Sequence, residues 1–361
     1  MDVRFDERGP VVLVGGAGVV GQRLARLLGR EGHAVTIAGR SEERARASLG
    51  AARGAGAEAR FLAWDLGARS ASGHGEPVGV SALVGLVNDP GDVVLDAALA
   101  GGVPYVDITR WTSRMAAAVG KVALSHARSP VVLASSWMGG LLPRLVAHLA
   151  AQAGGARKVD GAVRYALADA SGGDSVDYMD RLWVPFEVLE DGATTLVEPF
   201  ADRREVAIDG ARTLVGRFDT PEQWSLPLTL GTRDARVRIG FDHVPMTRLF
   251  AALVRTGLFW LLRGPRFRRL RHALLRAEGS EKREGARAAF RVDVEGTSRA
   301  AAEIASPEGQ ATLTAVGALL AVRWALGLRD GGVFFPEGDP ANTRLPSLLT
   351  ELGVETTVLP A

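Results

Sequence analysis

The sequence predicts an α/β protein with a doubly wound parallel sheet and a second, mixed α/β domain that contains an antiparallel sheet. Three observations predict this class. Short apolar runs alternate with helical patterns over the first 140 residues. A glycine-rich turn follows the first of these runs, and longer segments of alternating polarity replace the pattern after about residue 150.

The first domain is expected to contain six strands separated by helices. The apolar runs that read as strands are 11–14, 34–38, 60–63, 82–87, 105–108 and 131–134. Helical spacing of leucine and alanine between them predicts helices at 20–30, 41–49, 93–100 and 112–127. Residues 67–79, rich in glycine and serine, read as a loop with a short helix. Six strands in this order match a Rossmann-type nucleotide-binding domain.

The second half carries the alternating strands of the antiparallel sheet. They are expected at 162–168, 187–189, 195–197, 205–208 and 237–240, and residues 290–295 and 300–304 form a hairpin across Gly-Thr-Ser-Arg. Helices are expected at 141–153, 310–326 and 345–352, with one long helical excursion over 244–277.

Composition excludes several classes of function. With 361 residues, 47% hydrophobic content and a net charge of +2, nothing indicates a nucleic-acid partner. There is no cysteine, so thiolate nucleophiles and cysteine-ligated metals are excluded, and the six histidines show no ligand spacing. We therefore expect no metal. The polar amino end, without an apolar signal core, indicates a cytoplasmic protein.

The most apolar stretch, 249–262, is too short to span a bilayer and is interrupted by Arg255. An arginine-rich run follows it to residue 276. Two readings remain open. One is a buried helix followed by a solvated basic helix; the other is a surface at 249–276 that contacts a membrane, an acidic carrier protein or an apolar substrate.

The turn after the first strand fits G-x-G-x-x-G. It consists of Gly16, Ala17, Gly18, Val19, Val20 and Gly21. In this motif the first glycine permits a tight turn, the second lets a pyrophosphate approach the backbone, and the third lets helix and strand pack closely. The free N–H groups at the helix start then face the phosphates. The pattern predicts a dinucleotide site.

The end of the second strand predicts which dinucleotide binds. NAD enzymes place a carboxylate there for the ribose 2′-hydroxyl, but this chain has Gly39 and Arg40. A guanidinium can bind a 2′-phosphate, and Ser41 and Arg44 add a hydroxyl and a charge. NADP(H) is therefore the expected cofactor. Asp65, after the third strand, is either an adenine contact or the cap of a turn.

These motifs resemble the saccharopine dehydrogenase superfamily of NAD(P)-binding oxidoreductases. The resemblance lies in "VVLVGGAGVVGQRLARLL" with "VTIAGRSEERA", in "AALAGGVPYVDIT", and in the carboxyl-terminal "GGVFFPEGD". It covers most of 10–145 and returns over about 310–353. Two stretches depart from it: "GLVNDPGD" stands where the family has a Gly-Pro-Phe turn, and "DITRW" replaces its usual loop after the fifth strand.

The resemblance implies an NAD(P)-dependent oxidoreductase. Together with Arg40, it makes an NADPH-dependent reductase of a C=N, C=O or activated C=C bond in a biosynthetic intermediate the leading hypothesis. It also implies an NADP-binding domain at 1–145, a substrate and dimerisation domain at 146–308, and a helical segment at 309–361 that packs back on the first domain. The protein is then expected to form a homodimer and to act on a small molecule. Two alternatives stay open: a non-catalytic NADP(H) sensor or scaffold, and a membrane- or carrier-associated reductase of a lipid or polyketide-like substrate.

Ligands of a doubly wound sheet lie beyond the carboxyl ends of its strands. Asn88 is therefore expected to bind the cofactor, whereas Asp89 before Pro90 reads as a turn former. Asp107 and Arg110 are catalytic candidates, although Arg110 can equally pair with Asp107. The expected substrate contacts in these loops are Trp111, Trp137 and Met138, with core packing an equal reading for the two tryptophans.

The reduced atom needs a proton from an acid, from water or from a protonated substrate. No tyrosine has a lysine four residues later, which argues against a short-chain-dehydrogenase mechanism. The candidate donors are Tyr178, in "SGGDSVDYMDR", and His243. Arg181 is the candidate clamp for a substrate carboxylate.

Overall fold

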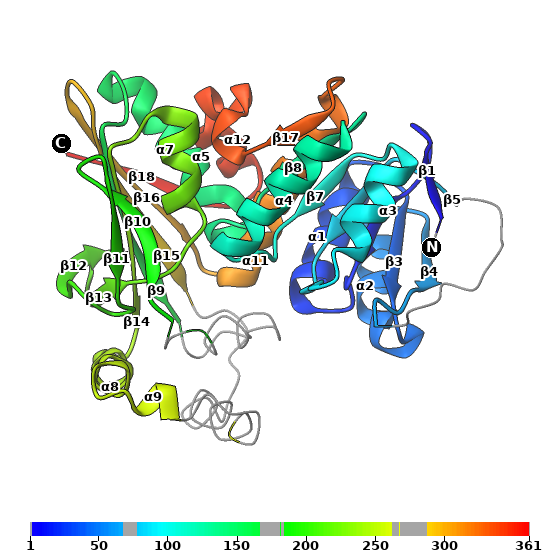
Figure 1. Ribbon diagram of the computed structural model, residues 1–361. Coiled ribbons are helices and arrows are strands. Elements are labelled where there is room, and N and C mark those ends of the chain that lie inside the picture. The colour runs from blue at the N-terminus through cyan, green and yellow to red at the C-terminus, as the bar shows by residue number, and fades with distance from the viewer. Residues whose placement is uncertain are drawn as a thin grey trace. The chain divides into compact units, whose positions relative to one another are not determined.

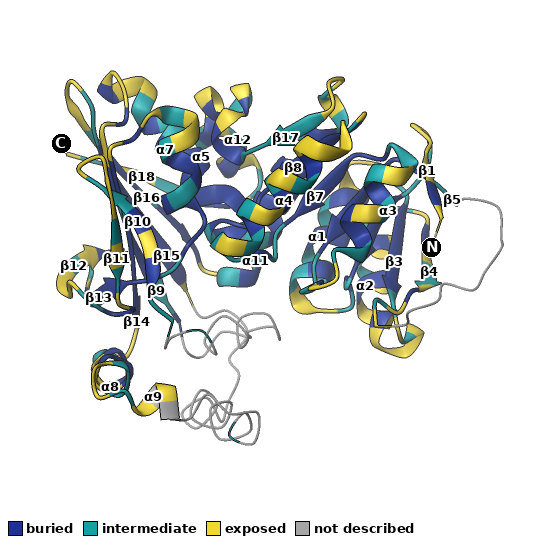
Figure 2. Cartoon of the chain, in the orientation of Figure 1, coloured by how far each residue is buried: buried dark blue, intermediate teal, exposed yellow. Residues whose placement is uncertain are grey.

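The structure is a computed structural model that describes residues 2–67, 78–166, 181, 184–261, 267 and 287–360. The chain divides into two compact units. Unit 1 comprises residues 1–141 and 314–336, and unit 2 comprises residues 142–313 and 337–361. Figure 1 traces the chain, and Figure 2 shows that the sheets of both units consist largely of buried residues.

Unit 1 is built on a parallel sheet of seven strands in the order β17-β8-β7-β6-β2-β3-β4. Its strands are β2 (Val11–Val14), β3 (Val35–Gly39), β4 (Ala59–Ala63), β6 (Ala82–Gly85), β7 (Tyr105–Asp107), β8 (Pro130–Leu133) and β17 (Gly332–Phe334). Every residue of β2, β6, β7 and β8 is buried, which explains their uninterrupted apolar sequences. The predicted doubly wound fold is confirmed.

Helices connect these strands: α1 (Val19–Arg30), α2 (Glu42–Gly54), α3 (Val93–Gly101) and α4 (Thr112–Ser125). In α1 the buried residues Gly21, Leu24, Ala25 and Leu28 recur every three or four positions, the spacing of one helix face. A small parallel ribbon, β1 (Val3–Phe5) with β5 (Val78–Val80), was not predicted. The strand order reverses between β2 and β6, so the loops after β2, β6 and β7 define the switch point of the fold.

Unit 2 contains a mixed sheet in the order β12-β13-β14-β9-β15-β16-β18. Its strands are β9 (Lys158–Tyr165), β12 (Arg204–Ile208), β13 (Ala211–Arg217), β14 (Asp234–Phe241), β15 (Ala288–Glu295), β16 (Arg299–Ser306) and β18 (Glu355–Leu359). All neighbours are antiparallel except β14 and β9, which pair in parallel. The predicted hairpin is β15–β16, and β10 (Phe186–Glu190) pairs with β11 (Ala193–Val197) as a separate ribbon.

The carboxyl-terminal segment is shared between the two units. Residues 314–336 supply most of α11 (Gln310–Gly327) and strand β17 to unit 1. Residues 337–361, which we expected to return to the first domain as well, belong to unit 2. Several contacts hold them there: β18 pairs with β16, and the buried Arg144 donates to Asp339 at 2.5 Å and to Asn342 at 3.0 Å.

The helical excursion of unit 2 is described as α8 (Val244–Arg255) and α9 (Leu258–Leu261). Leu249, Leu258 and Trp260 are exposed on these helices. Most of the arginine-rich run that follows lies outside the described residues. Unit 2 also contains α7 (Glu222–Leu230) and α12 (Leu345–Glu351). No helix in the described part of the chain is long and apolar enough to span a bilayer.

Candidate functional site

The glycine-rich turn between β2 and α1 has the backbone geometry of a phosphate-binding loop. Gly15 has a φ of +80°, the left-handed conformation that glycine adopts without steric cost. A Cβ at Gly21 would lie 2.3 Å from the carbonyl oxygen of Gly16, so only glycine lets the helix pack this closely on the turn. Gly15 is the left-handed residue of this turn, and Gly16 closes the turn, because its N–H donates to the Leu13 carbonyl at 3.2 Å. A Cβ at Gly16 would come within 2.8 Å of Leu13 Cβ, so glycine is favoured there as well.

Gly18 lies at the open mouth of this turn. It is the N-cap of α1, and no side chain caps the helix there. A Cβ at Gly18 would meet no atom within 4 Å. The first N–H groups of a helix have no partner within the helix, and they carry the positive end of its dipole. The turn thus offers open space beside unpaired donors, which is what a diphosphate group needs.

Ser48 of α2 holds the turn from below. Its hydroxyl, fully buried, donates to the Gly16 carbonyl at 2.6 Å. Removal of this donor in Ser48→Ala leaves a buried carbonyl without it, and we expect the free energy of unfolding to fall by about 1–2 kcal/mol. Urea denaturation measures the change. Ser125→Ala is the matched control, because that hydroxyl only bonds the Val122 carbonyl within its own helix, and an equal loss in both variants would contradict the prediction.

The end of β3 presents two exposed arginines beside this turn. Arg40 directly follows the strand, and Arg44 lies in the first turn of α2. Ser41 caps α2 by accepting the Arg44 N–H at 3.4 Å, so its hydroxyl has a structural task. Neither guanidinium is ion-paired within the part of the chain that the structure describes. Both are therefore available to an anionic group.

Asp65, the expected adenine contact, follows β4 and is exposed. Its Oδ1 accepts the N–H of Gly67 at 3.0 Å. This local hydrogen bond is that of a turn cap, which is the alternative reading of Asp65.

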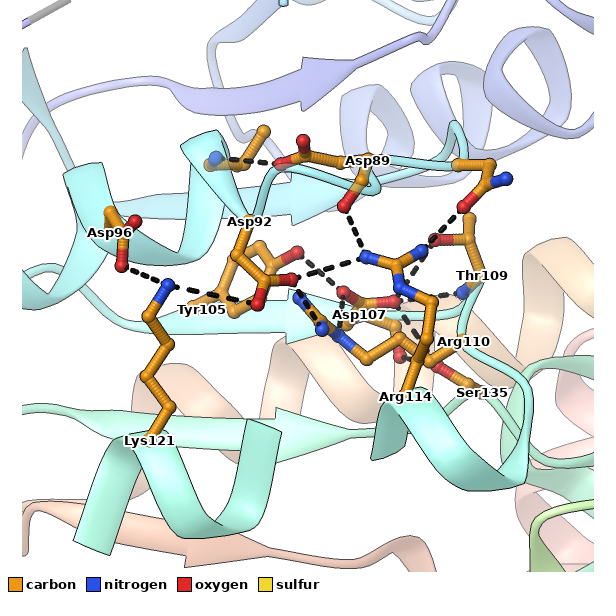
Figure 3. Close-up of polar contacts among 12 residues, drawn as sticks. Asp89, Asp92, Asp96, Tyr105, Asp107, Thr109, Arg110, Arg114, Lys121 and Ser135 are labelled. Atoms are coloured by element: carbon orange, nitrogen blue, oxygen red, sulfur yellow. Dashed lines mark hydrogen bonds and ion pairs between the residues drawn. The ribbon is translucent and has the colours of Figure 1, made fainter. Parts of the chain in front are cut away.

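A network of charged side chains fills the loops after β6 and β7 (Figure 3). Asp107 is its centre and is 2% exposed. Its Oδ2 accepts Tyr105 Oη–H at 2.6 Å and Arg110 Nε–H at 2.7 Å. Its Oδ1 accepts the Thr109 N–H at 2.9 Å and the Ser135 hydroxyl at 3.1 Å. With the Thr109 hydroxyl, which donates to Oδ1 at 3.1 Å, five donor groups surround this carboxylate, which leaves it little capacity to bind a substrate.

Arg110 is 1% exposed and lies between two carboxylates. It donates to Asp107 and, through Nη1, to Asp92 at 2.6 Å. Burial alone would raise the pKa of Asp92, but the charges of Arg110, Lys121 and Arg114 outweigh it, and the pKa is lowered. Asp92 therefore stays charged at neutral pH. Of the two readings of Arg110, the pairing with Asp107 is the one that its geometry supports.

Tyr105 is fully buried beside Asp107. Burial and the neighbouring carboxylate raise the pKa of Tyr105 well above its usual range. The phenol thus keeps its proton and donates it in a hydrogen bond to Asp107, which removes it as an acid toward a substrate.

Arg114, one turn beyond Arg110, fixes the loop after β6. It donates to Asn88 Oδ1, to the Asp89 carbonyl and, at 3.1 Å, to Asp92. Its guanidinium also lies 5.2 Å from the ring centre of Trp111, a cation–π distance. Because Asn88 Oδ1 accepts from Arg114, the side chain that we expected to contact the cofactor is oriented by a residue that the sequence analysis missed.

Asp89 behaves as the predicted turn former. Its carbonyl accepts the Asp92 N–H at 3.1 Å, and its Oδ2 accepts the Val94 N–H at 2.8 Å at the start of α3. The side chain is thereby used in helix capping.

Trp137 and Met138 lie in the first turn of α5 (Trp137–Ala153), and the regular part of this helix begins at Leu141, as predicted. Met138, Gly139 and Gly140 all have positive φ, so α5 is broken at its first turn. Met138 is buried and its sulfur lies 3.9 Å from the Thr314 hydroxyl, whereas Trp137 is partly exposed. Met138 thus packs in the core of unit 1, and its role as a substrate contact stays a prediction.

The remaining candidates belong to unit 2. Arg181 is 3.4 Å from Asp219, and His243 is an exposed N-cap of α8. Tyr178 lies outside the described residues. Within the described ranges, no group of three or more His, Asp or Glu side chains is arranged to hold a metal ion.

Comparisons with known proteins agree with this geometry. Residues 11–131 match the family described as saccharopine dehydrogenase NADP binding domain. Among solved structures, the chain is similar to an apo, histidine-tagged saccharopine dehydrogenase (L-Glu forming) from Saccharomyces cerevisiae. That match has a TM-score of 0.63 and 12% identity, and covers 98% of this chain and 100% of that chain.

A second solved structure, an NADH-dependent reductase A1-R′ complexed with NAD, matches with a TM-score of 0.25 and 13% identity, over 37% of this chain and 78% of that chain. This similarity is too low to carry an argument. No curated protein sequence matches the chain.

Proposed function

We propose that this chain is an NADPH-dependent oxidoreductase that acts on a small molecule. The proposal starts from residues 11–131, which match an NADP-binding domain of the saccharopine dehydrogenase type. The reaction that we propose is the reduction of a C=N, C=O or activated C=C bond in a biosynthetic intermediate. The observation that carries the proposal is the open, uncapped turn at Gly18 with an unpaired Arg40 beside it.

The turn suits a diphosphate for three reasons. Gly18 leaves its space open, α1 begins without a side-chain cap, and Ser48 holds the Gly16 carbonyl by a buried hydrogen bond. An anion in that space faces N–H donors and the positive end of a helix dipole. The residues present therefore fit the phosphates of a dinucleotide.

Arg40 supports NADP(H) over NAD(H). A guanidinium stabilises a 2′-phosphate by charge-assisted hydrogen bonds, and no carboxylate at position 39 opposes it. When bound, NADPH supplies the hydride. The residues of this chain then have to bind the phosphates, orient the substrate and allow a proton to reach the reduced atom.

Arg40→Ala is expected to weaken NADPH about 10–100-fold while it changes NADH affinity less than about threefold, because only NADPH carries the 2′-phosphate. Titration of coenzyme fluorescence with purified protein measures both affinities. Arg46→Ala is the matched control, since Arg46 is exposed on the same helix α2 but lies beyond its first turn. Equal losses for both coenzymes, or a wild-type protein without preference, would remove the NADP(H) assignment.

The proton donor is proposed to lie outside the buried network. Asp107, Tyr105 and Arg110 are engaged with one another and are 2% exposed or less. His243 is exposed, and Tyr178 and Arg181 remain proposed as donor and carboxylate clamp from the sequence. A protonated iminium substrate would need no acid from the protein.

The burial of this charged network favours a second candidate function, a non-catalytic NADP(H) sensor or scaffold. Both catalytic candidates in unit 1, Asp107 and Arg110, are used to hold loops together. A sensor binds NADPH with the selectivity described above but transfers no hydride. NADPH oxidation with any member of a panel of imines, ketones and enones excludes it.

A further inference from the structure

A cavity of about 390 Å³ lies at the edge of the unit 1 sheet opposite the glycine-rich turn. Its wall includes Gly9, Ala34, Ser81 and Pro104, which precede β2, β3, β6 and β7 respectively. The amino ends of parallel strands meet at one edge of a sheet, whereas the turn at Gly18 follows a carboxyl end. The cavity is therefore separate from the proposed nucleotide site.

Ser81 is the buried polar group of this cavity. It is 4% exposed, and its hydroxyl has no hydrogen-bond partner among the described residues. Its backbone N–H is engaged, because it donates to the Pro10 carbonyl at 3.1 Å. A buried hydroxyl without a partner is destabilising, and an acceptor atom placed in the cavity would satisfy it.

Two guanidinium groups give the cavity a positive wall. Arg8 has no side-chain partner within the described ranges. Arg329 has only Glu7, which is 4.0 Å away and highly exposed. Such an exposed pair contributes little, so both arginines are open to a stronger anion. His33, also in the wall, lies 3.9 Å from Glu31.

The wall also contains the carboxylate of Glu7, the partner of Arg329, and one apolar side. Phe5 is 45% exposed, and Leu326, Leu328 and the buried Pro104 complete this side. A site with an apolar wall and a few polar groups fits a compact molecule with a hydrocarbon part and one polar end. Two guanidinium groups and a hydroxyl donor outnumber the single carboxylate of Glu7, which makes an anion the preferred polar end.

We propose that this cavity is a second small-molecule site of unit 1, and that it takes a compact aryl or alkyl carboxylate. The carboxylate accepts from the Ser81 hydroxyl and from Arg8 and Arg329, and the hydrocarbon part packs against Phe5 and Leu328. The site does not depend on the proposed NADP(H) function, since none of its residues belongs to the glycine-rich turn.

The probe for this site is 4-(trifluoromethyl)benzoate, observed by ¹⁹F NMR line broadening with the full-length protein. Its neutral isostere 4-(trifluoromethyl)benzamide tests the need for an anion. The variants are Ser81→Ala and the double variant Arg8→Ala/Arg329→Ala. The control is Arg4→Ala, which removes an exposed arginine of β1 that is not part of the cavity wall. Thermal unfolding of each variant checks that it folds.

The benzoate is expected to bind in the presence of saturating NADPH, at least about tenfold more tightly than the benzamide. The double variant is expected to lose about tenfold in benzoate affinity, Ser81→Ala to lose less, and Arg4→Ala to leave it unchanged. Each of four results would overturn the proposal: displacement of the benzoate by NADPH, equal binding of the benzamide, an unchanged affinity in the double variant, or no binding at 10 mM probe, which is on the order of the weakest useful affinity.

Discussion

A protein with aspartate at position 18 is expected to fold as well as the wild type and to lose NADP(H) binding by about 100-fold or more. Gly18 has a φ of −85°, which any residue adopts, and its Cβ would project into open space. Aspartate is also a favourable N-cap, so the folded state gains rather than loses. The new carboxylate, however, fills the space and the helix-dipole field that the coenzyme phosphates need.

Two further glycine variants make this prediction specific. Gly18→Ala adds only a methyl group to the open space, so its loss of affinity is expected to be smaller than that of Gly18→Asp. Gly21→Ala places a Cβ 2.3 Å from the Gly16 carbonyl oxygen, so it is expected to lower both stability and affinity. Coenzyme titration and thermal unfolding on the three variants separate these effects. Gly18→Asp protein that binds NADPH within about threefold of wild type would remove the proposed phosphate site.

Asp107→Ala is expected to lower the free energy of unfolding by about 3–5 kcal/mol, because it removes a carboxylate from a buried ion pair. Arg110, at 1% exposure, would keep only Asp92 as a charged partner, and Tyr105 would lose its acceptor. Urea denaturation of the full-length protein, monitored by tryptophan fluorescence, measures this loss. A catalytic Asp107 would behave differently: the variant would keep its stability and lose only turnover.

The control for Asp107 is Asp96→Ala at the exposed end of the same cluster. Asp96 pairs with Lys121 at 2.6 Å, and its side chain is 53% exposed. Exposed pairs contribute about 0–1 kcal/mol, so Asp96→Ala is expected to be nearly neutral. Comparable losses in the two variants would show that burial does not determine the energetics of this network.

The sequence predicted unit 1 well, because its strands are buried on both faces and therefore read as uninterrupted apolar runs. The resemblance to the saccharopine dehydrogenase type, predicted from the motifs around Gly16 and Arg40, is confirmed for residues 11–131 by the family match. Strand β17 was missed, because its three partly exposed residues, Gly332–Phe334, give no strand pattern of their own. Only pairing with β8 makes them a strand.

Unit 2 was predicted less completely. The parallel pairing of β14 with β9 joins segments that lie far apart in the chain, and alternation within each strand does not state its direction. The strand β18 was missed for a similar reason: Glu355–Leu359 becomes part of a sheet only through β16.

Contacts between distant segments of the chain also limited the prediction of the site. The glycine motif predicted the tight turn, but it did not predict that Gly15, which precedes the motif, would be the left-handed residue of that turn. The role of Arg110 stayed open, since a spacing of three residues from Asp107 does not exclude other partners. Asp92 and Arg114 were missed because they come from other segments. The one signal for Arg114 was its place four residues, about one helical turn, after Arg110.

The pairing of β17 with β8 has a consequence for biosynthesis. A ribosome releases residues 1–141 long before Gly332–Phe334, and at roughly 5–20 residues per second the interval lasts on the order of ten seconds or more. During that time the nascent chain exposes the outer edge of β8, an unpaired ladder that invites association with other chains. Newly made protein is thus vulnerable to aggregation throughout this interval, and chaperone capture is expected to concentrate on ribosomes that have passed codon 141 but not yet codon 334.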